Sequence, residues 1–287
     1  MTVWGETRAR GGRVLLRIED HDRQRSRTVF ETAILDDLAW LGLAPDAPLV
    51  RQSERGDIYT RALDGLRARG LVYACSCSRS DVEQSNVVQP LAPADRGVKP
   101  RTTPGTGLSD SSGAELRYPG TCRDRGLSEG SGIGLRVRLE ASVEHFVDLR
   151  LGPQEQVPAE QCGDLLVRDR KGNWTYQFAA TVDDYVQGIT LVVRGVDLLA
   201  STGRQLQLAR LLGRVEPPAF LHHALIMKST DAASAGSAGP LQKLSKSDGD
   251  TGIRELRARG WTPAEVVEHA LSLVLPGPPA FPYHGGS

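Results

Sequence analysis

The N-terminal quarter of the chain alternates short apolar runs with amphipathic stretches, and this alternation restricts the fold most strongly. Residues 14–18 have the length and composition of a buried strand, and 48–50 form a second strand candidate. Apolar side chains recur at helical spacing over 28–41 and again over 58–71. Strands and helices that alternate at these lengths build βαβ units on a parallel sheet. We therefore predict an α/β fold with a Rossmann-type parallel sheet.

The middle of the chain departs from this alternation. Residues 84–116 are rich in Pro, Gly, Ser and Thr and lack sustained periodicity, so a mobile loop is expected there. The strand-like stretches that follow indicate a small β-rich insert. They are 135–139, 146–149, 164–167 and 174–178.

The α/β alternation resumes after the insert. A strand is expected at 189–193, a helix at 201–212 with Ser201 and Thr202 as good N-caps, and a further strand at 224–227.

The C-terminal part begins with a flexible Gly/Ala/Ser spacer over 231–239. Two helices are predicted beyond it, at 253–259 and 263–274. The second has a strong start signal, because Pro263 follows Thr262. A disordered tail is expected after residue 275.

These patterns divide the chain into four segments. They are the first part of the Rossmann domain (1–74), the insert (75–174), the second part of the Rossmann domain (175–228) and a C-terminal region with helices and a tail (229–287).

Composition excludes some classes of protein. The 35 basic and 35 acidic residues cancel, which argues against a uniformly basic nucleic-acid coat but leaves room for a local patch. No apolar run approaches the roughly 18–20 residues that span a bilayer, and the N-terminus lacks the apolar core of a signal peptide. We expect a cytoplasmic, monomeric protein that does not bind a membrane. Its cysteines should stay reduced in that compartment.

Residues 243–247, Lys-Leu-Ser-Lys-Ser, carry two ammonium groups among small hydroxyl residues. Lys243 and Lys246 can close around a polyphosphate, and the serines and backbone N–H groups add donors. Taken alone, the pentapeptide also fits a solvated surface loop. The main alternative fold is accordingly a generic nucleotide-binding α/β protein in which this loop is coincidental.

Charged residues also stand where predicted strands end, which is where open α/β sheets bind ligands. Glu19 follows the first strand and can hold a ligand ammonium group; the alternative is an acidic turn paired with neighbouring arginines. Arg194 follows the strand at 189–193 and can pair with a carboxylate. Its alternative is a surface ion pair with an aspartate at 183, 184 or 197. Tyr176 either aims its hydroxyl at a ligand or packs in the core.

Cysteines suggest a metal site. Cys75, Cys77 and Cys122 supply thiolates suited to zinc, and Tyr118 lies near Cys122 in the sequence. The alternative is three free thiols. Cys162 stands apart as a packed thiol, and the pair at 222–223 is expected to be surface histidines without a role.

Four segments, taken in order, resemble the motifs of the glutamyl-tRNA synthetases of class I. They are Arg-Ile-Glu-Asp-His-Asp at 17–22, Tyr-Gln-Phe-Ala-Ala-Thr-Val-Asp-Asp at 176–184, Val-Arg-Gly-Val-Asp-Leu at 193–198 and Lys-Leu-Ser-Lys-Ser at 243–247. The short length and the cysteine pattern resemble the truncated paralogues in this family, which attach glutamate to the queuosine base of tRNA(Asp). The resemblance implies a ligase that uses ATP, Mg²⁺, L-glutamate and queuosine-containing tRNA(Asp).

The resemblance also implies roles for individual residues. Glu19 would hold the α-ammonium group of glutamate, and Tyr176 and Arg194 would contact its side chain and carboxylate groups. Lys246 would be the catalytic residue that binds the ATP phosphates as pyrophosphate leaves, with Lys243 beside it. Zinc would be bound by Cys75, Cys77, Tyr118 and Cys122.

The sequence departs from the family at its start. In the family a strand and a His-x-Gly-His motif precede the segment equivalent to Trp4-Gly5, and neither is present here. We expect a sheet without one central strand and an ATP site that lacks one half. Two alternative functions follow: a clipped glutamyl-tRNA synthetase that charges a 3′ end, or a catalytically inactive RNA-binding remnant.

Overall fold

The computed structural model describes residues 1–20, 28–87, 116–225, 227–229, 241–243 and 252–274. The predicted spacer and tail lie outside these residues, as do nearly all of the predicted loop at 84–116 and the lysine loop after Lys243. No helix in the described part is both long and apolar enough to cross a membrane.

The central sheet has four strands in the order β6-β5-β9-β8. β8 (Leu191–Gly195) runs parallel to β9 (Ala219–His223), and β9 runs parallel to β5 (Glu144–Asp148). β6 (Gly152–Gln156) closes the sheet as an antiparallel hairpin with β5. The predicted parallel sheet is present, but the prediction of one of its strands at 224–227 is wrong, because β9 ends at His223. Ala219 to His223 is the segment that pairs along β8, so long-range pairing fixes the boundary.

A second parallel pair stands apart from this sheet. β1 (Arg17–Ile18) pairs only with β2 (Val50–Arg51) among the described residues. The strand expected at 14–18 is therefore only two residues long. Residues of the β1 segment and of β8 line opposite parts of one cleft, and no described strand pairs between them.

A third sheet is antiparallel and contains β3 (Val72–Cys75), β4 (Gly134–Val137) and β7 (Leu165–Arg168), in that order. It agrees with the predicted strands at 135–139 and 164–167. The strand expected at 146–149 does not join this sheet, because β5 pairs with β9 in the central one.

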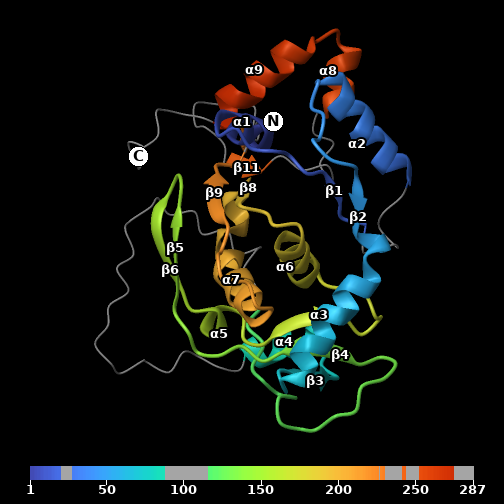
Figure 1. The fold of residues 1–287 in the computed structure, drawn as a ribbon, viewed down its shortest axis with the longest axis vertical. Coiled ribbons are helices and arrows are strands. Elements are labelled where there is room, and N and C mark those ends of the chain that lie inside the picture. The colour runs from blue at the N-terminus through green and yellow to red at the C-terminus, as the bar shows by residue number, and fades with distance from the viewer. Residues whose placement is uncertain (21–27, 88–115, 226, 230–240, 244–251, 275–287) are drawn as a thin grey trace, which may run out of the picture.

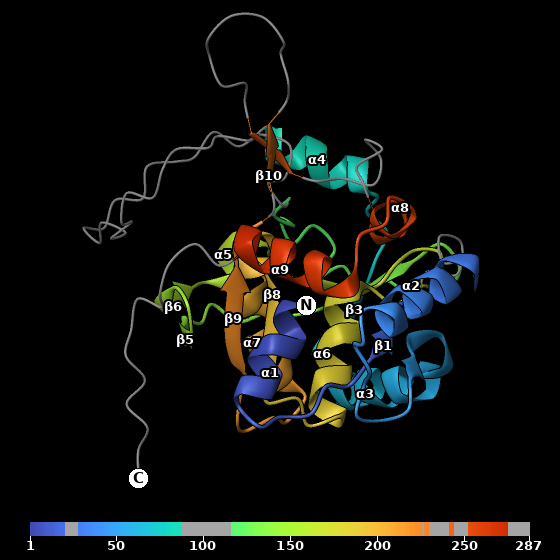
Figure 2. The same cartoon turned by 90° about the horizontal axis from the view of Figure 1, so that it is seen from above.

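Helices surround the central sheet (Figure 1). In both views α6 and α7 lie side by side next to the parallel strands, and α1 lies against β8 (Figure 2). The longer helices are α1 (Thr2–Ala9), α2 (Thr28–Trp40), α3 (Gly56–Ala68), α4 (Arg79–Val87), α6 (Tyr176–Val186), α7 (Thr202–Leu211) and α9 (Pro263–Val274). The short elements are η1 (Gln52–Glu54), α5 (Pro158–Gln161), η2 (Val196–Ser201), α8 (Ile253–Ala258), β10 (Met227–Ser229) and β11 (Leu241–Lys243).

The prediction of a strand at 174–178 is wrong, since α6 begins at Tyr176. The aromatic residues there have strand-like composition, but they pack as a helix start. Trp174 stacks on Phe178 with ring centroids 5.4 Å apart, and Phe178 is fully buried. The neighbours Ala179 and Ala180 are also buried and favour a helix that packs closely.

Two predicted helix starts have different outcomes. The Ser201 and Thr202 side chains do not cap α7; their hydroxyls accept hydrogen bonds from Gln177 and Arg194. Thr262 behaves as predicted, because its hydroxyl accepts the backbone N–H of Glu265 while the Glu265 carboxylate accepts the N–H of Thr262.

Candidate active site

A cleft of about 380 Å³ opens between the β1 segment, α1, α6 and β8. Glu19, Tyr176 and Arg194 all line it. The structure thus brings together the three residues that the sequence analysis selected for binding glutamate, from three separate elements. The cleft is also lined by Arg13, Arg17 and Asp184, so basic side chains outnumber acidic ones in it.

Arg194 lies in β8 and is held by three neutral side chains. Its Nε donates to Nε2 of His222 at 3.0 Å, Nη1 to Oε1 of Gln205 at 2.6 Å, and Nη2 to Oγ1 of Thr202 at 2.8 Å. Burial lowers the pKa of Arg194. The predicted alternative, an ion pair with Asp183 or Asp184, is not what these contacts show. Because these acceptors carry no negative charge, they do not neutralise the guanidinium, and its positive charge can attract a carboxylate in the cleft.

Tyr176 begins α6 and faces the same cleft. Its pKa is raised, first by burial and then by the negative charge of Glu19. A phenol with a raised pKa remains protonated and able to donate a hydrogen bond. Glu19 is exposed, while Asp20 beside it accepts the Ser53 N–H at 2.8 Å and the Ser53 hydroxyl at 2.6 Å. Asp20 therefore anchors the segment that carries Glu19.

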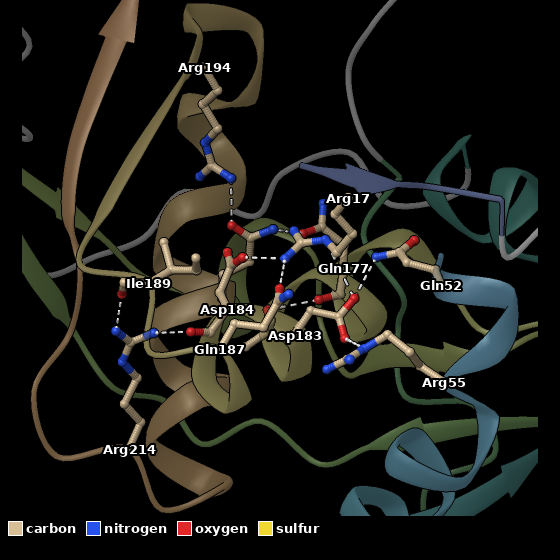
Figure 3. Close-up of polar contacts among 12 residues, drawn as sticks. Arg17, Gln52, Arg55, Gln177, Asp183, Asp184, Gln187, Ile189, Arg194 and Arg214 are labelled. Carbon is tan, nitrogen blue, oxygen red and sulfur yellow. Dashed lines mark hydrogen bonds and ion pairs between the residues drawn. The ribbon is translucent and has the colours of Figure 1, made fainter. Parts of the chain in front are cut away.

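An ionic network joins the wall of the cleft to the protein interior (Figure 3). Arg17 Nη1 donates to Oδ1 of Asp184 at 2.9 Å and to Oε1 of Gln187 at 3.0 Å. Burial raises the pKa of Asp184 despite the nearby Arg17. The network ties β1, which precedes Glu19, to α6, which begins with Tyr176.

Asp183 is the most enclosed member of this network, with no exposed surface. Its carboxylate accepts Arg55 Nε at 2.6 Å, Gln52 Nε2 at 2.9 Å and the Tyr59 hydroxyl at 2.9 Å. Burial and the Asp183 charge raise the pKa of Tyr59. These contacts fasten α3 and η1 to α6.

His222 is a residue whose importance the sequence analysis missed. It is 1% exposed, and its Nδ1 lies 2.7 Å from Oδ2 of Asp148, which is equally buried. The expectation of a surface histidine pair is therefore wrong for His222. The available signal was its place directly after Phe220 and Leu221 on an apolar strand; its partner Asp148 lies far away in the sequence.

The three predicted cysteine ligands converge. The Sγ atoms of Cys75, Cys77 and Cys122 all lie within 4.8 Å of one another. The Tyr118 hydroxyl is 3.4 Å from Cys75 Sγ and accepts the Cys122 N–H at 2.8 Å. Three soft donors and one oxygen at a single point fit a closed zinc site.

The surroundings act differently on the thiols of this cluster, since burial raises the pKa of Cys77 to about 12. Burial alone would raise the pKa of Cys122, but hydrogen bonds from Ser76, Cys77 and Tyr118 bring it to about 6. The Arg136 guanidinium lies 3.4 Å from Cys75 Sγ through its Nε and stacks 3.6 Å from the Tyr118 ring centroid. Cys162 is buried and outside the cluster, as predicted for a packed thiol.

Of the two lysines of the predicted phosphate loop, Lys243 alone lies among the described residues. Lys243 ends β11, which pairs with β10 as an antiparallel hairpin. Lys246 lies outside the described residues.

Residues 1–270 match the family described as "tRNA synthetases class I (E and Q), catalytic domain". The chain belongs to this family. It is therefore a ligase of the aminoacyl-tRNA synthetase type.

Relatives with high similarity share one name. The Glutamyl-Q tRNA(Asp) synthetase of Bordetella bronchiseptica is 39% identical over 280 residues, which cover 94% of this chain and 81% of that protein. The protein of the same name from Rhodobacter capsulatus is 36% identical, with 90% and 88% covered. These synthetases support a role in tRNA glutamylation.

A solved structure supports the fold. A glutamate tRNA ligase from Elizabethkingia meningosepticum, crystallised with its amino acid, superposes with a TM-score of 0.60 at 26% identity. The match covers 83% of this chain and 46% of that one, so this class I synthetase chain spans about half of the solved ligase's length.

Proposed function

We propose that this chain activates L-glutamate with ATP and transfers it to the queuosine base of tRNA(Asp). The observation that carries the proposal is the convergence of Glu19, Tyr176 and Arg194 on one cleft. An amino acid with a carboxylate side chain presents one positive and two negative groups, and this cleft offers the complementary charges.

Within this proposal each side chain has one task. The Glu19 carboxylate accepts the α-ammonium group, and Arg194 binds a carboxylate of the ligand with two parallel hydrogen bonds. The Tyr176 hydroxyl donates to an oxygen of the same ligand. Since Arg194 is partly buried and held by neutral acceptors, its attraction for a carboxylate is less screened than at the surface.

The reaction has two steps. The glutamate α-carboxylate attacks the α-phosphorus of ATP, the bond to the β-phosphate oxygen breaks, and glutamyl-adenylate and pyrophosphate form. A hydroxyl of queuosine then attacks the glutamyl carbonyl and AMP leaves. Such chemistry depends on positioning and on charge stabilisation, for which we propose Lys246 and Lys243. A bound Mg²⁺ would neutralise phosphate charge.

Zinc is proposed as a structural ion. Cys75, Cys77, Tyr118 and Cys122 would hold it at the edge of the antiparallel sheet, where β3 ends at Cys75. A closed set of four ligands leaves no position for a substrate, so such an ion stabilises the insert.

The names of the relatives support queuosine as the acceptor, because they specify tRNA(Asp) and the Q nucleoside. The family resemblance implies that the truncated paralogues activate glutamate without tRNA, whereas full-length glutamyl-tRNA synthetases need tRNA. Glutamate-dependent exchange of pyrophosphate into ATP, measured without tRNA, therefore tests the proposal. Exchange that requires tRNA would favour an enzyme that charges a 3′ end.

One observation favours a second candidate. The β1–β2 pair and the central sheet face the cleft as separate sheets in the described residues. In the described residues no strand pairing joins the β1 side of the cleft to the central sheet, and the second candidate is a chain that binds RNA without activating glutamate. Glutamate binding without pyrophosphate exchange, at any tRNA concentration, would support that candidate.

A further inference from the structure

We propose that His222 and Asp148 are positioning residues that set the orientation of Arg194 for the glutamate carboxylate. The inference rests on the proposed function of the cleft and adds two residues to it. Neither residue lines the cleft; both act through Arg194.

The three side chains form one line across three neighbouring strands. Arg194 of β8 and His222 of β9 are partners in the parallel register, and Asp148 of β5 pairs opposite Phe220. Arg194 Nε lies 3.0 Å from His222 Nε2, and His222 Nδ1 lies 2.7 Å from Asp148 Oδ2. The His222 and Asp148 side chains have no exposed surface. Water therefore does not compete for these contacts.

The donors and acceptors leave one protonation state for His222. A guanidinium Nε–H only donates, so Nε2 of His222 must carry a lone pair toward it. Asp148 accepts the backbone N–H groups of Arg150 and Leu151 on Oδ1 and that of His222 on Oδ2, and these hydrogen bonds favour its ionised form. Nδ1 of His222 therefore carries the proton and donates to Asp148. The imidazole is neutral.

The neutral imidazole between Asp148 and Arg194 has an electrostatic consequence for ligand binding. A carboxylate in direct contact with Arg194 would compete with the ligand for the guanidinium charge. A neutral imidazole fixes the orientation of Arg194 without neutralising it, while Asp148 fixes the imidazole from its far side. With Gln205 and Thr202 on the terminal nitrogens, three of the guanidinium N–H groups are used, and the guanidinium also contacts the hydroxyl of Tyr176, which lines the same cleft.

Two substitutions separate this role from simple packing. In His222→Gln the amide oxygen can replace Nε2 as the acceptor for Arg194. In His222→Asn the shorter amide can replace Nδ1 as the donor to Asp148 but does not reach Arg194. Both variants remove an aromatic ring from the same buried site, so similar losses of stability are expected for the two.

The measurement is the dissociation constant of L-glutamate by calorimetry on the full chain, with thermal unfolding as the folding control. His222→Asn should weaken glutamate binding by roughly 10- to 100-fold, because a hydrogen bond to a charged group is lost. His222→Gln should stay within about 3-fold of the parent, as its oxygen keeps that bond. Equal affinities for parent and His222→Asn would overturn the inference and leave the proposed function standing. A parent that does not bind glutamate would overturn both.

A measurement on the parent covers the case in which neither variant folds. Nitrogen NMR of the labelled protein reports which imidazole nitrogen carries the proton. The inference requires a protonated Nδ1 on His222 and a coupling between its Nε2 and the Nε of Arg194 across the hydrogen bond. The opposite tautomer at neutral pH would overturn it.

Discussion

Arg17 and Asp184 are separated by 167 positions and joined by a hydrogen bond of 2.9 Å in the wall of the candidate active site. Arg17 lies in β1 and Asp184 in α6. Because Glu19 follows β1 and Tyr176 begins α6, this one contact connects the segments that carry two of the three proposed glutamate ligands. The adjacent carboxylate of Asp183 extends the connection to α3 and η1.

Asp183→Asn should destabilise the fold strongly. The substitution leaves the buried guanidinium of Arg55 without its charged partner, and breaking a buried ion pair typically costs about 3–5 kcal/mol. The free energy of unfolding in urea measures the effect. Asp64→Asn is the matched control, since the Asp64 side chain is 56% exposed and pairs with Arg67 at the surface. Losses of equal size in the two variants would contradict the structural role of Asp183.

The lowered pKa of Asp148 predicts that the free energy of unfolding depends on pH. Burial alone would raise its pKa, but hydrogen bonds from His222 and from backbone N–H groups hold it below the ordinary 3.8. A carboxyl group with a lowered pKa in the folded state contributes stability above its unfolded pKa and loses it as the pH falls through the folded value. The stability difference between parent and Asp148→Asn should therefore be constant above about pH 5 and shrink below about pH 4. A difference that is independent of pH would contradict this.

The cysteine cluster should bind zinc with a stoichiometry of about one ion per chain. Elemental analysis of protein purified from zinc-replete cells measures the content. Cys77→Ser should lower it, because one of the three converging thiols is removed. Cys162→Ser removes a buried thiol outside the cluster and should retain the metal. Metal-free parent protein with three titratable thiols would show that the site is not a zinc site.

Lys246→Ala should reduce formation of glutamyl-adenylate by roughly 10²–10³-fold, because a contact to developing negative charge is lost. Its thermal unfolding should match that of the parent. Lys171→Ala is the control, since this exposed lysine lies between β7 and α6 and outside the cleft. If Lys246→Ala and Lys171→Ala activate glutamate at the parent rate, Lys246 has no part in the reaction.

The parts of the fold that local spacing determines were predictable from the sequence. The helices α2, α3, α7, α8 and α9 all lie where apolar periodicity and start signals indicate them. The start of α6 was not predictable in this way, since its aromatic residues also suit a strand. Contacts from distant parts of the chain hold this helix in place, and its Asp183 accepts hydrogen bonds from residues 124 to 131 positions away.

The candidate site, too, could be predicted from the sequence only in part. Glu19, Tyr176 and Arg194 were selected through motifs that resemble a known family, and only the folded chain brings them to one cleft. His222 and Asp148 were missed because neither belongs to such a motif, and their contact spans 74 positions. The placement of β5 beside β9 also rests on pairing between distant segments.

Transfer of labelled glutamate to tRNA(Asp) tests the central claim most directly. The acceptors to compare are tRNA(Asp) with queuosine, the same tRNA without queuosine, and queuosine-containing tRNA(Asp) that lacks its 3′-terminal adenosine. We predict that the first and third acceptors incorporate glutamate to the same extent and that the second does not. Incorporation that is independent of queuosine and requires the 3′-terminal adenosine would contradict the account.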